Sequence, residues 1–200
     1  MISPADALQR LRDGNRRFVA GERGNTESFS EARRAELASG QKPFAAIVAC
    51  SDSRVPVELL FDQGLGDLFV VRVAGNIVAP SQIGSVEFAA AHLGTRLVVV
   101  LGHSNCGAVD AALKNLANTD GIASPHLRSI VNSIRPALEP LVAANSEISL
   151  REAVAANVDQ SVAQLRQNSD VLKELVESGE IMIVGAKYSI ETGEVRFFDG

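Results

Sequence analysis

Four runs of apolar residues, rich in β-branched side chains, predict the strands of this 200-residue chain. The runs cover residues 44–49, 68–73, 97–101 and 181–184. Continuous apolar runs of this length are typical of strands that are buried on both faces of a sheet. Residues 188–198 add a hairpin around the polar turn at residues 191–194.

Segments with helical periodicity separate these runs. Four apolar residues between positions 81 and 93 share one helical face, with Gly94 as the helix stop: Ile83, Val86, Ala90 and Leu93. Further helices are predicted at residues 107–116, 126–144 and 170–178, and a helical turn at residues 56–61. A capping box at residues 149–152 starts one more long helix. We expect Pro136 and Pro140 to break or bend the helix at 126–144.

Strands that alternate with helices predict an α/β fold. We expect a mainly parallel central sheet of four or five strands flanked by helices, with the C-terminal hairpin as its antiparallel edge. All 200 residues fit one domain.

Residues 1–40 are expected to form an N-terminal helical arm within this domain. Ser3 and Pro4 begin its first helix, which Gly21 ends, and Gly40 closes a second helix at residues 30–39 as a left-handed cap. The first helix carries a narrow apolar stripe. We therefore expect it to lie on its own sheet or on a partner subunit.

Charge, apolar stretches and cysteine count exclude several classes of function. The net charge is −5 with acidic and basic residues mixed along the chain, which argues against nucleic-acid and anionic-membrane partners and favours a small-molecule substrate. No apolar stretch reaches the roughly 20 residues of a membrane span, so no membrane partner is expected. Two cysteines are too few for a disulfide framework, and the N-terminus lacks a basic region followed by an apolar one. A cytoplasmic location is expected.

Residues able to bind a metal follow two of the predicted strands. Cys50 and Asp52 follow the first strand, and His103 and Cys106 follow the third. Because sites form at the carboxyl ends of parallel strands, we expect the four side chains to lie together. Two thiolates, an imidazole and a carboxylate suit Zn²⁺, and Arg54 is placed to bind the carboxylate of Asp52 with both arms of its guanidinium.

Taken singly, these residues also have simpler interpretations. A single cysteine is more often a small buried apolar residue than a ligand, and Arg54 could form a surface salt bridge of little energetic value. A disulfide between Cys50 and Cys106 is a third possibility. It would leave His103 and Asp52 unexplained, and a reducing compartment would oppose it.

Five segments together resemble the β-class carbonic anhydrases. They are CSDSRVP at residues 50–56, GDLFVVR at 66–72, AGNIV at 74–78, SVEF at 85–88 and GHSNCGA at 102–108. The resemblance covers about residues 41–113 closely and both flanks more loosely. It implies one Zn²⁺ per chain on Cys50, His103 and Cys106. Asp52 is then either a fourth ligand in a closed state or the partner of Arg54 in an open one.

The resemblance also implies a substrate pocket. Its residues map onto Gln41, Phe69, Phe88 and the backbone N–H of Gly107, and Phe88 stands where the family has a Tyr, so that a hydroxyl is lost. Relatives form dimers that often pair into tetramers, with the active site at the dimer interface. We accordingly expect a homodimer or a homotetramer.

The expected reaction is the reversible hydration of CO₂ to bicarbonate and a proton by zinc-bound hydroxide. Asp52 and Arg54 are the expected catalytic residues, the first to orient the nucleophile and the second to position Asp52. Two alternatives stay open: hydrolysis of a related heterocumulene such as CS₂, and a zinc-binding scaffold without turnover that keeps Asp52 as a permanent ligand.

A subgroup of the family is inhibited by bicarbonate at a pocket that includes a Trp shortly before the first cysteine. Ile47 occupies that place and the chain has no Trp, although Arg72 matches another member of the pocket. The sequence therefore favours the plant-like subgroup.

Overall fold

A five-stranded sheet forms the centre of the protein in the computed structural model, which describes residues 2–22, 24, 26–116, 122–145 and 147–198. The strands lie in the order β2, β1, β3, β4, β5. Their bounds are β1 Ala45–Ala49, β2 Leu68–Arg72, β3 Leu97–His103, β4 Met182–Tyr188 and β5 Val195–Phe197. Strands β1 to β4 run parallel to one another, and β5 pairs antiparallel with β4. The predicted α/β fold with an antiparallel edge hairpin is confirmed.

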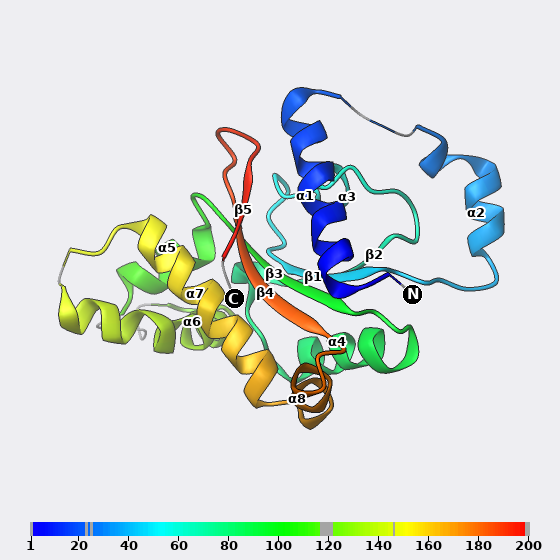
Figure 1. The fold of residues 1–200 in the computed structure, drawn as a ribbon. Helices are drawn as coiled ribbons and strands as arrows, with labels where there is room; N and C mark the ends of the chain where they lie inside the picture. The colour runs from blue at the N-terminus through cyan, green and yellow to red at the C-terminus, as the bar shows by residue number, and fades with distance from the viewer. Residues whose placement is uncertain (1, 23, 25, 117–121, 146, 199–200) are drawn as a thin grey trace.

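Helices cover both faces of this sheet (Figure 1). The helices α1 Pro4–Ala20 and α3 Val57–Leu60 lie on one face, and α4 Pro80–His92, α7 Leu150–Gln167 and α8 Asp170–Glu177 lie on the other. A third apolar cluster joins α5 Gly107–Lys114 and α6 Pro125–Ala144 to the start of α7. The remaining described elements are α2 Glu31–Leu37 and the 3₁₀ turns η1 Thr26–Phe29 and η2 Ala74–Asn76. None of the described helices is long and apolar enough to cross a membrane.

Side chains of β1 alternate between the two faces and are buried on both. Ile47 packs in the cluster that contains Leu11 of α1 and Phe61, whereas Val48 packs in the cluster that contains Val86 of α4 and Val158 of α7. Burial on both sides explains why this strand is continuously apolar instead of alternating.

Helix α1 packs against its own sheet, the first of its two expected positions. Ala7 and Leu11 are fully buried in the core that lines this face of the sheet. The side chain of Asn15 donates to the backbone oxygens of Leu60 at 3.1 Å and Gly193 at 2.9 Å, and accepts from the N–H of Val195 at 2.8 Å. The predicted Ser3 cap and the left-handed Gly21 are confirmed. The hydrogen bonds of Asn15 connect α1 to both α3 and the hairpin.

Two strands are longer than predicted. β3 continues through Gly102 to His103 instead of ending at Leu101. The missing side chain at Gly102 lets helix α7 pack closely against the strand at this point. A Cβ at Gly102 would come within 2.6 Å of Val158 and 3.1 Å of Val154. β4 likewise continues past residue 184 to residue 188, so the hairpin uses the end of β4 and no separate strand starts at residue 188.

Two helix predictions are corrected: α6 has no break, and Gly40 is not a left-handed cap. Helix α6 runs through Pro136 and Pro140 without a break, because the two prolines lie one turn apart on its exposed side, where water can bond the carbonyls that lose their N–H partners. Helix α2 ends at Leu37 with Ala38 as its cap, and Gly40 has φ 158°, outside the left-handed helical conformation. We expect a loop at residues 118–125, between the helices predicted at 107–116 and 126–144, and its residues 118–121 lie outside the described residues.

Gly14 of α1 packs closely against the backbone at the end of α3, since a Cβ there would overlap the backbone oxygen of Phe61. We predict that Gly14→Ala lowers the free energy of unfolding by about 1–3 kcal/mol, because a backbone atom cannot move aside as a side chain can. Gly84→Ala in α4 is the control. A Cβ at Gly84 meets no atom within 4 Å, so this change should stabilise the protein by about 0.5–1 kcal/mol through helix propensity. Equal effects of the two changes in urea denaturation would contradict this packing.

Candidate metal centre

Cys50, His103 and Cys106 lie together at the carboxyl end of the sheet. In the β1 and β3 register Ala49 is paired with Leu101, so Cys50 and His103 leave neighbouring strands at nearly the same level. Cys106 caps the start of α5. One ligand atom from each of the three residues lies within 4.8 Å of the other two, and all three residues are buried. The set is positioned to hold one metal ion.

The imidazole of His103 is oriented by its neighbouring backbone. Its Nδ1 lies 2.9 Å from the carbonyl oxygen of Ser104, and because a carbonyl only accepts, Nδ1 must carry the proton. The other ring nitrogen, Nε2, is buried without a hydrogen-bond partner among the described residues. A buried polar atom without a partner is costly, and a metal ion would supply the partner.

The side chains of Cys50 and Cys106 shift each other's pKa in opposite directions. A hydrogen bond from the Cys106 thiol lowers the pKa of Cys50, and the same bond, with burial, raises the pKa of Cys106. Both cysteines are free, so the disulfide alternative is not present in this structure. Two sulfurs and one imidazole nitrogen form the donor set that Zn²⁺ prefers, which fits this metal better than Mg²⁺ or Ca²⁺.

Gly75, which is not among the predicted site residues, contributes a hydrogen bond to the sulfur of Cys50. Its backbone N–H lies 3.3 Å from Sγ, at a φ of 71° that favours glycine. A Cβ there would come within 2.8 Å of Ile134. The carbonyl of Gly75 in turn accepts from the side chain of Asn157 in α7 at 2.8 Å. The only signal in the sequence was the glycine inside the AGNIV segment.

Asp52 and Arg54 form a pair beside the three buried residues. Arg54 donates from Nε to Oδ1 at 2.9 Å and from Nη2 to Oδ2 at 2.8 Å, and its backbone N–H also donates to Oδ1. These side-chain hydrogen bonds hold the pKa of Asp52 well below its usual range. Asp52 Oδ2 lies 3.8 Å from His103 Nε2, and Asp52 is not part of the three-residue set. The structure therefore has the arrangement expected for the open state.

Arg72 fixes the backbone of the same loop. Its Nε donates to the carbonyl of Cys50 at 3.0 Å and its Nη2 to the carbonyl of Asp52 at 2.6 Å. Arg72 therefore has a structural role: it connects the end of β2 to the residues that follow β1.

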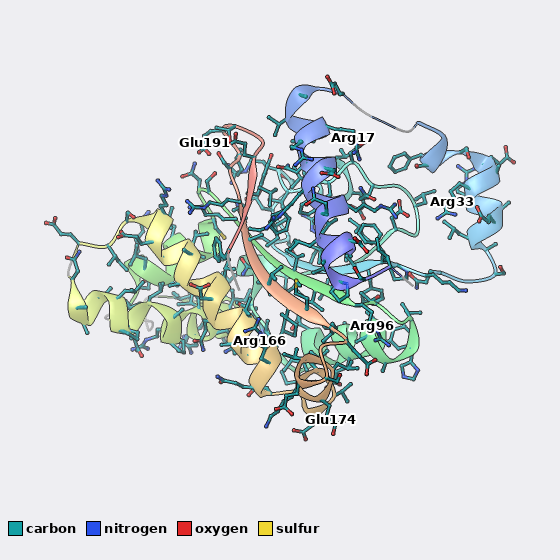
Figure 2. The ribbon with its side chains drawn as sticks, in the orientation of Figure 1. Arg17, Arg33, Arg96, Arg166, Glu174 and Glu191 are labelled. Carbon is teal, nitrogen blue, oxygen red and sulfur yellow. The ribbon has the colours of Figure 1, made fainter. Side chains whose placement is uncertain are left out.

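Glu191 supports the second loop, between His103 and Cys106, from the tip of the β4 and β5 hairpin (Figure 2). Its carboxylate accepts from Ser104 Oγ at 2.7 Å and from Asn105 Nδ2 at 2.8 Å. The hydrogen bond from Ser104 is the main reason that the pKa of Glu191 is lowered. No sequence signal points to this contact, because Glu191 is remote in sequence and lies in a generic turn.

The residues expected in the substrate pocket divide into two groups. Gly107 is exposed and directly follows Cys106, so it lies at the carboxyl end of the sheet, next to the metal ligands. Gln41 precedes β1 whereas Cys50 follows it, and the five residues of this strand span about 16 Å. Phe69 is paired with Ala46 near the start of β1, and its ring centroid lies 6.3 Å from that of Phe88, which is 46% exposed. One chain does not bring these three side chains to its own metal ligands.

Comparisons with known proteins agree with this geometry. A family model described as carbonic anhydrase matches residues 45–195. Carbonic anhydrase 2 of Mycobacterium tuberculosis is 41% identical over 198 residues, which cover 98% of this chain and 94% of the relative. The solved structure of the β-carbonic anhydrase CcaA has a TM-score of 0.80 at 28% identity, covering 96% of this chain and 95% of that one.

The same fold occurs in two tetrameric β-carbonic anhydrases from Sordaria macrospora, with a TM-score of 0.73 at 22% identity and coverage of 98% for both chains. These comparisons do not separate the plant-like subgroup from the others. Together with the Cys-His-Cys set, they show that the chain belongs to the zinc-binding β-carbonic anhydrase family.

Proposed function

We propose that this protein hydrates CO₂ reversibly to bicarbonate and a proton, with one Zn²⁺ per chain held by Cys50, His103 and Cys106. The observation that carries the proposal is a three-ligand set whose nearest carboxylate, that of Asp52, is bound on both oxygens by Arg54. Three protein ligands with an open fourth position are the mark of a catalytic zinc site, whereas structural sites have four. When bound, Zn²⁺ acidifies a water molecule and thereby supplies the nucleophile near neutral pH.

The chain's own residues then position the reactants. Asp52 stays ionised because its pKa is lowered by Arg54, so it can accept a hydrogen bond from the nucleophile and orient it. Arg54 and Arg72 together fix the carboxylate and its backbone. The N–H of Gly107, in the first turn of α5, is proposed to bind a substrate oxygen, since first-turn N–H groups lack helical partners.

A scaffold without turnover is less well supported by the geometry. It would require Asp52 as a permanent fourth ligand, yet both oxygens of Asp52 accept hydrogen bonds from Arg54. No contact of the described residues favours CS₂ over CO₂, so CS₂ hydrolysis serves as the comparison in the assay below.

Stopped-flow hydration of CO₂ by the zinc-loaded protein tests the proposal. We predict activity that is low in mild acid and rises through neutral to weakly alkaline pH. Two thiolates offset the charge of Zn²⁺, so the bound water should be less acidic than in an all-histidine site, where its pKa is about 7. Protonation of Asp52 does not contribute to the low activity in mild acid, because its lowered pKa keeps the carboxylate ionised there. A stoichiometric zinc protein that hydrolyses CS₂ but leaves CO₂ unchanged, or that turns over neither, would refute the proposed reaction.

Replacement of Arg54 tests the pairing with Asp52. Arg54→Ala removes both side-chain hydrogen bonds to a carboxylate whose Oδ2 lies 3.8 Å from His103 Nε2. The freed carboxylate should then bind the metal and fill the fourth position. We predict that CO₂ hydration falls by about 100-fold or more while zinc content is unchanged.

Arg34→Ala on the exposed face of α2 is the matched control for the loss of an arginine and should keep full activity. Normal turnover in Arg54→Ala would show that Arg54 does not control Asp52. Loss of zinc together with activity would show that Arg54 acts on metal binding instead.

We further propose that the protein works as a homodimer or a homotetramer. Gln41, Phe69 and Phe88 lie away from the metal ligands of their own chain, so they can line a substrate pocket only from a partner subunit. Phe88 is 46% exposed, and its ring packs between those of Phe69 and His92. The Sordaria macrospora proteins that share the fold are tetrameric.

Phe88→Glu tests this assembly. We predict that it weakens association and lowers CO₂ hydration together, because a buried unpaired carboxylate at an interface is costly. Leu127→Glu is the control, since Leu127 is also exposed, at 58%, but lies on α6. Light scattering after size-exclusion chromatography measures the first effect. A fully active monomer of Phe88→Glu would contradict the shared pocket.

We propose that the chain belongs to the plant-like subgroup, and two observations support this proposal. Ile47 is fully buried in β1, and Arg72 is already bonded to the carbonyls of Cys50 and Asp52. The chain also has no Trp with which such a bicarbonate pocket could form. Steep cooperative inhibition by bicarbonate at constant pH and ionic strength would contradict the assignment.

We propose a cytoplasmic location as well. It is supported by the two thiols, which are free and lie close enough to react with each other in an oxidising compartment. Cell fractionation that finds the protein in an oxidising compartment would refute it.

A further inference from the structure

A cavity lies beside the loop between His103 and Cys106. Its volume is about 550 Å³, and it is formed by the start of α7, the end of β4, the hairpin turn and the loop that carries Ser104 and Asn105. Cys50, His103 and Cys106 do not line it. Its size falls in the range of small-molecule sites, and it is distinct from the metal centre.

Three cations from different elements line this cavity. They are Arg151 in the first turn of α7, Lys187 near the end of β4 and Arg196 in β5. Lys187 and Arg196 are direct partners in the antiparallel register, and like charges placed opposite each other destabilise a strand pair. We call these three residues the basic pocket.

None of the three cations has an ion pair or a side-chain hydrogen bond with the residues that the structure describes. Burial lowers the pKa of Lys187, and the charges of Arg151 and Arg196 lower it further. The carboxylates of Glu191 and Glu194 also line the cavity, but Glu191 is turned to Ser104 and Asn105. Among the described residues, neither carboxylate forms an ion pair with Lys187, Arg151 or Arg196, so the three cations outnumber the two carboxylates that line the cavity.

We propose that the basic pocket binds a small polyvalent oxyanion, a phosphate or a compound that carries one. Two guanidinium groups and one ammonium group surround the same cavity, and a guanidinium binds phosphate oxygens in pairs. The N-terminal end of the 18-residue helix α7, where Arg151 lies, adds a favourable dipole. A bound anion would also relieve the repulsion between Lys187 and Arg196.

The structure favours a small ligand over a charged polymer. The cations line a concave cavity instead of a flat or elongated basic surface, and the chain as a whole carries a net charge of −5. The proposal does not depend on turnover at the metal centre, because it concerns binding at a different set of residues.

Inorganic phosphate is the probe, added to the zinc-loaded protein against chloride at matched ionic strength. We predict that phosphate raises the melting temperature and binds measurably in calorimetry. Lys187→Met and Arg196→Gln should each weaken phosphate binding by about tenfold or more, the effect expected for loss of one charge-assisted hydrogen bond. Without phosphate neither variant should be less stable than the starting protein, because each removes a repulsive pair.

Two controls separate this site from other anion effects. Arg34→Gln on α2 and Lys173→Met on α8 remove exposed cations elsewhere and should leave the phosphate response unchanged. The response should also persist in Arg54→Ala, which alters the metal centre. The proposal is overturned if phosphate has no effect on the starting protein, or if it acts equally on the two pocket variants, which would place the anion at the metal or on the general surface.

Discussion

The parallel pairing of β1 with β3 is the constraint on which the metal centre depends. Both strands are buried along their whole length, and their register pairs Ala49 with Leu101. Cys50 follows directly, and His103 ends the neighbouring strand two residues beyond Leu101. A slip of one residue would turn every side chain of a strand to the opposite face. The packing of the core therefore also fixes the distance between the thiol and the imidazole.

Helix α7 extends this constraint to the loops around the metal centre. Asn157 and Ser161 donate to the carbonyls of Gly75 and Asn76, and Gly75 donates to the sulfur of Cys50. Arg54 donates to the carboxylate of Asp52, and Arg72 donates to its backbone carbonyl. Buried amide and hydroxyl groups thus fix the sulfur, and charged groups fix the carboxylate. The site combines a rigid ligand set with one side chain whose position depends on a single partner.

Much of this arrangement could be predicted from the sequence, because local patterns encode it. Apolar runs indicated the four parallel strands, and polar residues at two strand ends indicated Cys50, His103 and Cys106. The contacts of Gly75 and Glu191 could not be predicted, because they join segments between 25 and 87 residues apart and depend on how the loops pack. The end of β3 was misplaced for the same reason. In the sequence Gly102 indicates the end of a strand, and only the packing of α7 against it explains why a glycine lies inside β3.

The metal-ligand set is the central claim, and zinc X-ray absorption on the loaded protein tests it most directly. We expect two sulfur ligands at about 2.3 Å and two nitrogen or oxygen ligands at about 2.0–2.1 Å for each zinc. Cys106→Ser should remove one sulfur from this shell or abolish binding. A zinc shell without sulfur, or one unchanged in Cys106→Ser, would show that the metal does not lie between Cys50, His103 and Cys106.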